Sequence, residues 1–341
     1  MKKIIALLIL TVMAVTAFVG CTTQDATTTQ NTTTTTEAPA AEGKLKFGLG
    51  TATTASAKDA TSDKAGQAQL TITIAAVLVD EDGKVVKAFI DCADSKGTYT
   101  AAGKANAADS FKTKYELGKD YNMVAYGGAV KEWFEQVDAY CALIVGKTAA
   151  EIKALEVEDG KGTDAVISAG CTITISDMTK AVENAIANAA ESSAKATDSV
   201  KIGVSTALTA TDATAEKAGS SKISSTIYAA AVGADGKVSA ASSDCIEVSF
   251  GFDITGKSTF DASKAIKSKK ELGKDYNMVA YGGAVKEWFE QAAAFDAATL
   301  GKTVAEIKAL EVDGGKGTAD LQSAGCTIVI SDFVKAAAKI G

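Results

Sequence analysis

The chain contains no histidine, no arginine and only one proline in 341 residues. The absence of histidine excludes acid–base catalysis by imidazole, zinc sites of the usual histidine type and axial haem ligation by histidine. The absence of arginine excludes bidentate clamps for phosphate or carboxylate groups. Aromatic residues make up only 6%, so the core must be built mainly from alanine, valine, isoleucine and leucine.

Basic residues are outnumbered by acidic ones, and the formal net charge is −7. Binding to a nucleic acid, or to an anionic membrane through protein charge, needs a basic patch that releases counterions or meets the surface potential. We therefore expect no nucleic-acid partner. The use of lysine alone, without arginine, is typical of an AT-rich genome and indicates a low-GC Gram-positive bacterium.

The N-terminus has the parts of an export signal. Two lysines, Lys2 and Lys3, precede an apolar run from Ile4 to Val19. This run is shorter than the roughly 18 residues that a membrane-spanning helix needs, and small residues lead up to Cys21. We predict a signal peptide over residues 1–20.

The segment Phe18-Val19-Gly20-Cys21 resembles the bacterial lipobox. The resemblance implies cleavage before Cys21, acylation of its thiol, and anchoring at the extracellular face of the cell membrane. Residues 21–43 are rich in threonine and nearly free of apolar side chains, so we expect a solvated tether.

The rest of the chain is a tandem duplication, because residues 116–136 and 271–291 are identical. We predict one domain over residues 44–190, a linker over 191–198 and a second domain over 199–341. Each repeat matches the usual size of a domain.

Each repeat shows the same predicted order of elements. In the first, strands cover Lys46 to Gly50, Gln69 to Val79 and Lys84 to Cys92, and Asp82-Gly83 predicts a hairpin turn. Side chains at helical spacing predict a long helix. A helix at Ala149–Leu155, a strand at Cys171–Ile175 and a last helix starting at Ser176-Asp177 follow. This order indicates an α+β fold with a mostly antiparallel sheet packed against helices. The side chains that define the long helix are Tyr126, Val130, Trp133, Val137 and Tyr140.

The identical block is a candidate site, because Tyr126-Gly127-Gly128 lets a ligand approach the backbone and Trp133 and Trp288 are the two tryptophans of the chain. The alternative interpretation is a core stripe with glycines that serve tight packing, which is the commoner role of such a pattern. Identity over this block is also what a recent duplication produces.

Four cysteines recur at matching positions in the two repeats: Cys92, Cys171, Cys245 and Cys326. An extracellular compartment permits disulfides, so one hypothesis is a bridge within each domain. The alternative is buried free thiols that pack as small hydrophobes. Cys141 has no counterpart, since Asp296 takes its place, and we expect a spare thiol on the long helix.

Two resemblances follow from these residues. The repeated Lys114-x-Glu116-Leu117-Gly118 and Glu132-Trp133-x-Glu135-Gln136 motifs resemble uncharacterised tandem-repeat lipoproteins of low-GC Gram-positive bacteria. Ala169-Gly170-Cys171-Thr172, after Asp164, is similar to the flavin-attachment segment of FMN-binding domains. That similarity implies covalent FMN on Thr172, and on Thr327 in the second repeat.

These observations predict a lipid-anchored cell-surface protein whose duplicated domains bind a small ligand or cofactor in a cell-envelope pathway, with FMN as the named candidate. The alternative is a structural or interaction module that contacts the cell wall or another envelope protein without a cofactor. The sequence shows no nucleophile beside a base, no repeated carboxylate pair and no metal-ligand cluster. We therefore expect that the chain is not an enzyme.

Overall fold

The computed structural model describes residues 44–106 and 111–341. The expected signal peptide, the tether and the acylation site Cys21 lie outside the described residues. The described elements include two antiparallel sheets and two groups of helices, so the α+β class with a sheet in each repeat is confirmed.

The first sheet belongs to the first repeat and has the strand order β4-β3-β2-β1-β5. The second sheet has the order β6-β7-β8 and repeats the three long strands. Their bounds are β1 Lys46–Lys58, β2 Gly66–Val79, β3 Val85–Tyr99, β4 Ala105–Asn106, β5 Ala190–Glu191, β6 Ser199–Thr211, β7 Gly219–Val232 and β8 Val238–Phe252.

The helices of each repeat follow its three long strands and return to cover its sheet. In the first repeat they are α1 Lys114–Leu117, η1 Gly118–Tyr121, α2 Trp133–Ile144, α3 Ala149–Lys153, η2 Glu158–Gly160, α4 Asp164–Ala169 and α5 Ser176–Ala187. In the second they are α6 Lys269–Leu272, η3 Gly273–Tyr276, α7 Trp288–Thr299, α8 Val304–Lys308, η4 Asp313–Gly315, α9 Ala319–Ser323, α10 Ser331–Ala337 and η5 Ala338–Ile340.

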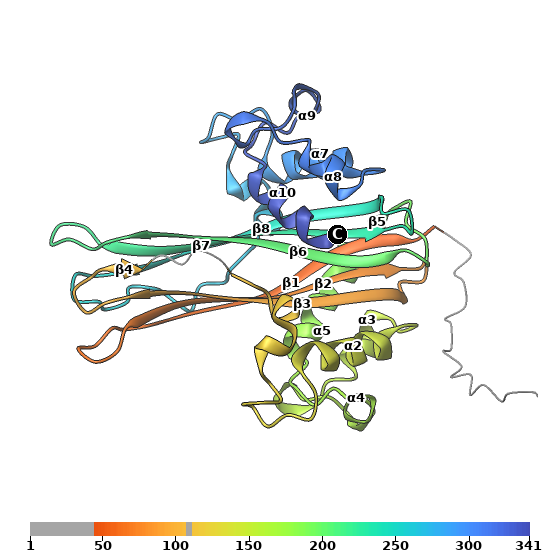
Figure 1. The fold of residues 1–341 in the computed structure, drawn as a ribbon, viewed down its shortest axis with the longest axis horizontal. Helices are drawn as coiled ribbons and strands as arrows, with labels where there is room; N and C mark the ends of the chain where they lie inside the picture. The colour runs from red at the N-terminus through yellow and green to blue at the C-terminus, as the bar shows by residue number, and fades with distance from the viewer. Residues whose placement is uncertain (1–43, 107–110) are drawn as a thin grey trace, which may run out of the picture. The chain divides into compact units, whose positions relative to one another are not determined.

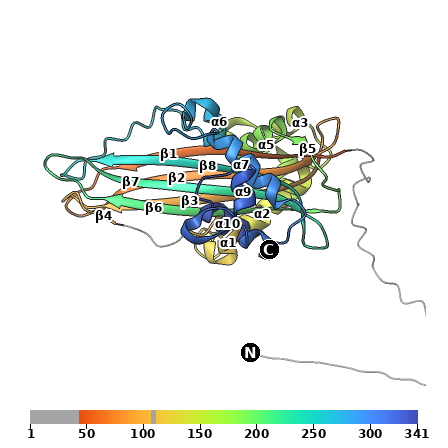
Figure 2. The same ribbon diagram turned by 90° about the horizontal axis from the view of Figure 1, so that it is seen from above.

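The elements form four layers, in the order helices, sheet, sheet, helices (Figures 1 and 2). The two faces of strand β2 explain this order of layers. Its side chains alternate between two faces, and Leu70, Ile72 and Ile74 enter a core that contains residues of both sheets. Ala75 and Val77 point the other way, into the core beneath the helices of the first repeat. A strand buried on both faces reads as a continuous apolar run, which explains the sequence of β2.

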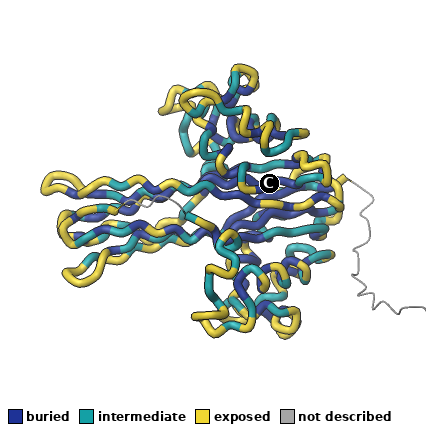
Figure 3. Tube along the Cα trace, viewed as in Figure 1, coloured by how far each residue is buried: buried dark blue, intermediate teal, exposed yellow. Residues whose placement is uncertain are grey.

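The core between the sheets joins the two repeats. It combines Phe47 and Ile72 of the first repeat with Ile202 and Phe250 of the second. Each repeat has in addition its own core under its helices. Figure 3 shows the buried strands in the middle of these layers and the exposed tips of the long hairpins. Neither sheet would be covered on its inner face without the other.

Glycines let the helices lie directly on the sheets. A Cβ added to Gly50 would come within 2.3 Å of the carbonyl oxygen of Ala181, and one added to Gly203 within 2.0 Å of that of Ala336. Gly50 pairs with Ala75 and Gly203 with Tyr228, which are equivalent positions in the two hairpins. The structure therefore matches Gly203 to Gly50.

Several predicted elements differ from those observed. The hairpin turn is confirmed, with Gly83 at a φ of 75°. The strand predicted at Cys171–Ile175 is wrong, because these residues form an irregular loop between α4 and α5. The long helix begins only at Trp133, so Tyr126 and Val130 lie in the loop before it. Apolar spacing extended the prediction past Glu132, the N-cap residue, whose N–H donates to the carboxylate of Glu135.

Gly203→Ala should lower the free energy of unfolding by about 2–3 kcal/mol, because the added methyl group forces β6 and α10 apart. Urea denaturation of the purified protein measures this. Gly236→Ala is the matched control, since a Cβ there meets open space and only its φ of 75° is unfavourable, at about 1 kcal/mol. Equal losses in both variants would contradict the close approach of helix and sheet.

Candidate functional site

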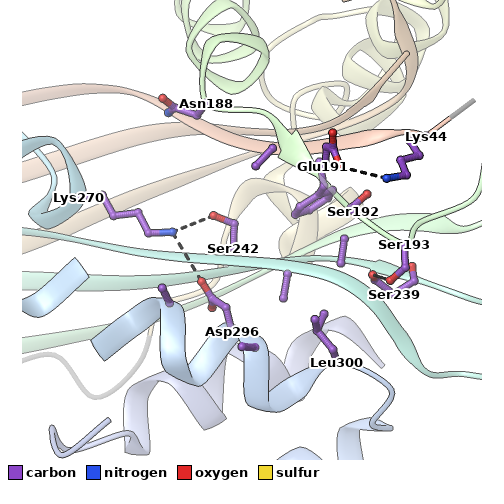
Figure 4. Close-up of a pocket in the computed structure, with 16 residues that line it drawn as sticks. Lys44, Asn188, Glu191, Ser192, Ser193, Ser239, Ser242, Lys270, Asp296 and Leu300 are labelled. Atoms are coloured by element: carbon purple, nitrogen blue, oxygen red, sulfur yellow. Dashed lines mark hydrogen bonds and ion pairs between the residues drawn. The ribbon is translucent and has the colours of Figure 1, made fainter. Parts of the chain in front are cut away.

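A pocket of about 630 Å³ opens between strand β8 and helix α7 of the second repeat, beside the region of β5 (Figure 4). Ser239 and Ser242 of β8 form one wall, and Ala293 and Asp296 of α7 form another. The remaining side comes from the first repeat, near β5. The pocket is therefore built from both repeats.

Lys270 holds the polar end of the pocket. Its Nζ donates a hydrogen bond to Oγ of Ser242 at 2.9 Å and lies 3.6 Å from the carboxylate of Asp296. Asp296 is only 8% exposed. Its carboxylate also accepts hydrogen bonds from the backbone N–H of Ser243, at 2.9 Å, and from the Ser243 hydroxyl. These bonds fix the carboxylate, so the position of the Lys270 ammonium group is defined as well.

The charges around the pocket cancel. Lys270 faces Asp296, and at the mouth Lys44 lies 3.4 Å from Glu191. Phe47 and Leu300 add apolar surface. An uncharged ligand with a hydroxyl group and an apolar body matches this lining better than an ion does, since a ligand ion would have to break an existing pair.

The corresponding place in the first repeat is a smaller pocket, of about 430 Å³, whose lining includes two aromatic side chains. Phe89 stands where the second repeat has Ser242, and Tyr115 stands where it has Lys270. The two rings pack edge to face at 4.7 Å. The Tyr115 hydroxyl donates to the carboxylate of Asp138, at 3.2 Å, and Ala293 replaces Asp138 in the second repeat. Burial, together with the negative charge of Asp138, raises the pKa of Tyr115 to about 12.

Four neighbouring positions thus differ together between the repeats. The fourth is Cys141, which Asp296 replaces. Sequence reasoning recorded that replacement but missed the site, because it compared identities between the repeats rather than differences. The signal was present: two aromatic residues of the first repeat, Phe89 and Tyr115, become polar in the second.

A buried aspartate supports this region in each repeat. Asp91 is 3% exposed and accepts hydrogen bonds from the backbone N–H groups of Cys92, at 2.6 Å, and Tyr115, at 3.1 Å. It thereby ties β3 to the start of α1. Burial raises its pKa to about 6, and burial raises the pKa of Asp244 in the second repeat as well.

The two tryptophans are core residues. Trp133 and Trp288 are 6% and 4% exposed. Each lies beside a lysine: Lys114 Nζ is 5.6 Å from the Trp133 ring centroid, and Lys269 Nζ is 5.5 Å from that of Trp288. These cation–π contacts cover the rings and leave the helix stripe in its structural role.

The predicted flavin positions are at the surface. Thr172 and Thr327 are exposed and follow α4 and α9. The Thr172 hydroxyl donates to Oε1 of Gln136 at 3.0 Å, and the Thr327 hydroxyl donates to Gln291 at the same distance. Neither threonine lines the pocket between β8 and α7.

The predicted disulfides are not formed in this structure. All five described cysteines are buried and free. Cys92, Cys141 and Cys171 belong to the core under the helices of the first repeat, where they pack as small apolar side chains. Cys171 lies in a loop, whereas the bridge hypothesis had placed it on a strand. Burial raises the pKa of Cys92 and of Cys171 to about 11, which keeps both as unreactive thiols.

Within residues 44–106 and 111–341, no group of three or more cysteine, aspartate or glutamate side chains is arranged to hold a metal ion. No helix in the same ranges is long and apolar enough to cross a membrane.

Comparison with known proteins finds a partial similarity to an enzyme. Over 129 residues, which are 34% of this chain, the sequence is 35% identical to a chlorophenol reductase of Desulfitobacterium hafniense. The match spans 38% of the length of that enzyme. No protein-family model and no solved structure matches the chain.

The similarity to an enzyme contradicts our expectation that the chain is not an enzyme. That expectation rested on missing nucleophiles, carboxylate pairs and metal clusters. Their absence from a sequence excludes only the chemistries that use them.

Stability should fall as the pH rises through 6. Asp91 has a pKa of about 6 when folded, against an ordinary value of 3.8, so the folded chain holds its proton more tightly. This tighter proton binding adds roughly 3 kcal/mol to the free energy of unfolding below about pH 4, and the addition is lost as the pH rises through 6. Thermal unfolding of the wild type and of Asp91→Asn between pH 4 and 8 measures it. The variant should show a flatter profile, and Asp82→Asn, at an exposed turn, should follow the wild type.

Proposed function

We propose that the chain is a lipid-anchored protein of the cell surface that binds a small uncharged molecule in the pocket between β8 and α7. The observation that carries this proposal is the joint replacement of Phe89, Tyr115 and Asp138 by Ser242, Lys270 and Ala293. The pocket is larger in the second repeat, about 630 Å³ against about 430 Å³ in the first. A ligand that fills it would bury the apolar side chains of its lining.

Phenols are the ligand class that we propose. A phenol has one hydroxyl group, which the Lys270 and Ser242 side chains can hydrogen-bond, and a flat apolar ring, which fits beside Ala293 and Leu300. The similarity to a chlorophenol reductase supports the same class. The match to that enzyme is partial, so its activity is carried over here only as a choice of compounds to test.

Narrowing the pocket with the residues of the first repeat should weaken binding. The double variant Ser242→Phe/Lys270→Tyr introduces the pair that already packs at 4.7 Å in the first repeat. Isothermal titration with 4-chlorophenol should show at least about a tenfold loss of affinity, since the hydrogen bonds of a charged group are removed.

The matched control reverses the exchange in the first repeat. Phe89→Ser/Tyr115→Lys leaves the pocket of the second repeat intact and should bind 4-chlorophenol as the wild type does. Thermal melts establish that both double variants are folded. Unchanged affinity in Ser242→Phe/Lys270→Tyr, or no binding by the wild type, would refute the phenol site. Consumption of the phenol with and without a chemical reductant, followed by chromatography, tests for turnover.

Covalent FMN on Thr172 and Thr327 is a second candidate. The observation that favours it is their shared geometry: both hydroxyls are at the surface and both give their proton to a buried glutamine. That arrangement leaves a lone pair of each hydroxyl oxygen without a hydrogen bond from the described residues.

Intact mass spectrometry of the protein from its native host tests the flavin and the anchor together. One FMN adduct should disappear in Thr172→Ala and another in Thr327→Ala, whereas Thr174→Ala, two residues away, should keep both. The acyl mass on Cys21 should disappear in Cys21→Ala, with release from the membrane fraction. An unmodified wild-type mass would eliminate both modifications.

A further inference from the structure

We propose that the chain carries two identical docking surfaces for an uncharged polysaccharide, centred on Tyr126 and Tyr281. Each tyrosine lies in a loop, residues 122–131 or 277–286, that precedes the long helix of its repeat. We call these the display loops. This inference does not depend on the phenol pocket, which lies elsewhere in the second repeat.

The display loops expose large apolar side chains to the same degree in both repeats. Tyr126 and Tyr281 are each 88% exposed, and Val130 and Val285 are 95% and 89% exposed. Such residues contribute almost nothing to folding, because their surface stays in water. Their identity in both repeats is therefore not explained by the core.

Buried polar groups hold the display loops in shape. The carboxylate of Glu132 is 6% exposed and accepts hydrogen bonds from the N–H groups of Met123, at 2.8 Å, and Val124, at 3.2 Å. Glu287 makes the same two bonds in the second repeat, at 2.9 and 3.2 Å. The tyrosines are thus presented from a fixed backbone, which lowers the entropy lost on binding.

A second segment common to both repeats adjoins each display loop. Gln136 donates to the carbonyl oxygen of Lys131 at 3.0 Å and accepts from the backbone N–H of Thr172 at 2.9 Å. Residues 168–172 have the same sequence as residues 323–327. The repeats thus differ at the pocket but agree in two segments, distant in sequence, that meet at Gln136 and its equivalent Gln291.

The size and number of these surfaces indicate the occupant. A stable protein interface buries about 800 Å² per partner, far more than one tyrosine and a few valines provide, whereas one aromatic ring suffices to cover the apolar face of a sugar. The display loops precede α2 and α7, in the two outer layers (Figure 1). Two equal sites in opposite outer layers can each bind a chain of a polymer that repeats its unit. The net charge of −7 favours an uncharged polymer over a polyanion.

Sedimentation of the full-length protein with insoluble chitin, an uncharged polymer of N-acetylated sugars, tests the proposal. Tyr126→Ala/Tyr281→Ala should lose at least about tenfold in apparent affinity, and each single variant should lose only about twofold, because one of the two surfaces remains. Both side chains are exposed, so the melting temperature should not change.

Two control variants show whether chitin binding depends on the display loops. Val157→Ala/Val312→Ala removes an equivalent pair of exposed apolar residues outside these loops and should bind chitin normally. The pocket variant Ser242→Phe/Lys270→Tyr should also bind normally, so failure of the phenol site leaves this test intact. Wild-type binding by the double tyrosine variant, no chitin binding by the wild type, or tyrosine-dependent self-association in its place would each overturn the proposal.

Discussion

The apolar contact between the two sheets is the constraint on which the rest of the structure depends. Strands β2 and β7 are buried on both faces, by a sheet on one side and by helices on the other. One repeat alone would expose the inner face of its sheet, which carries Leu70 and Ile72 in the first repeat and Ile223 and Ile227 in the second. The duplication therefore supplies each sheet with its partner layer. A large, nondirectional burial of this kind tolerates local change at the periphery.

That tolerance explains how the two repeats diverged. At the edge of the core between the sheets, Ser242 and Lys270 of the second repeat stand where the first has the aromatic pair Phe89 and Tyr115. The pocket there is larger in the second repeat and holds a fixed lysine–aspartate pair. The display loops did not diverge, although their exposed side chains add nothing to the core. Their backbone depends on the buried carboxylates Glu132 and Glu287, whose removal would leave N–H groups without acceptors. The residues at the pocket thus differ between the two repeats, while the display loops are the same in both.

Local signals predicted much of the fold. The Asp82-Gly83 turn and the apolar runs beside it gave the hairpin, because a turn with positive φ needs glycine and strands need alternating faces. The apolar stripe from Trp133 to Tyr140 predicted helix α2. The prediction also included Tyr126 and Val130, which lie before the helix, since apolar spacing cannot tell a buried valine from an exposed one. The predicted strand at Cys171 was wrong for a related reason: a short apolar run bonds as a strand only where a neighbouring edge is available.

The sequence by itself determined the duplication, the α+β class, the hairpins and the expectation of an export signal, because these depend on residue type and spacing along the chain. Tertiary structure decided the rest. It brought Lys270 of one element beside Ser242 and Asp296 of others, joined the repeats through a common core, and left Tyr126 in solvent. Periodicity shows which side chains share a face. Only the packing of distant segments decides whether that face meets another sheet, a ligand or water.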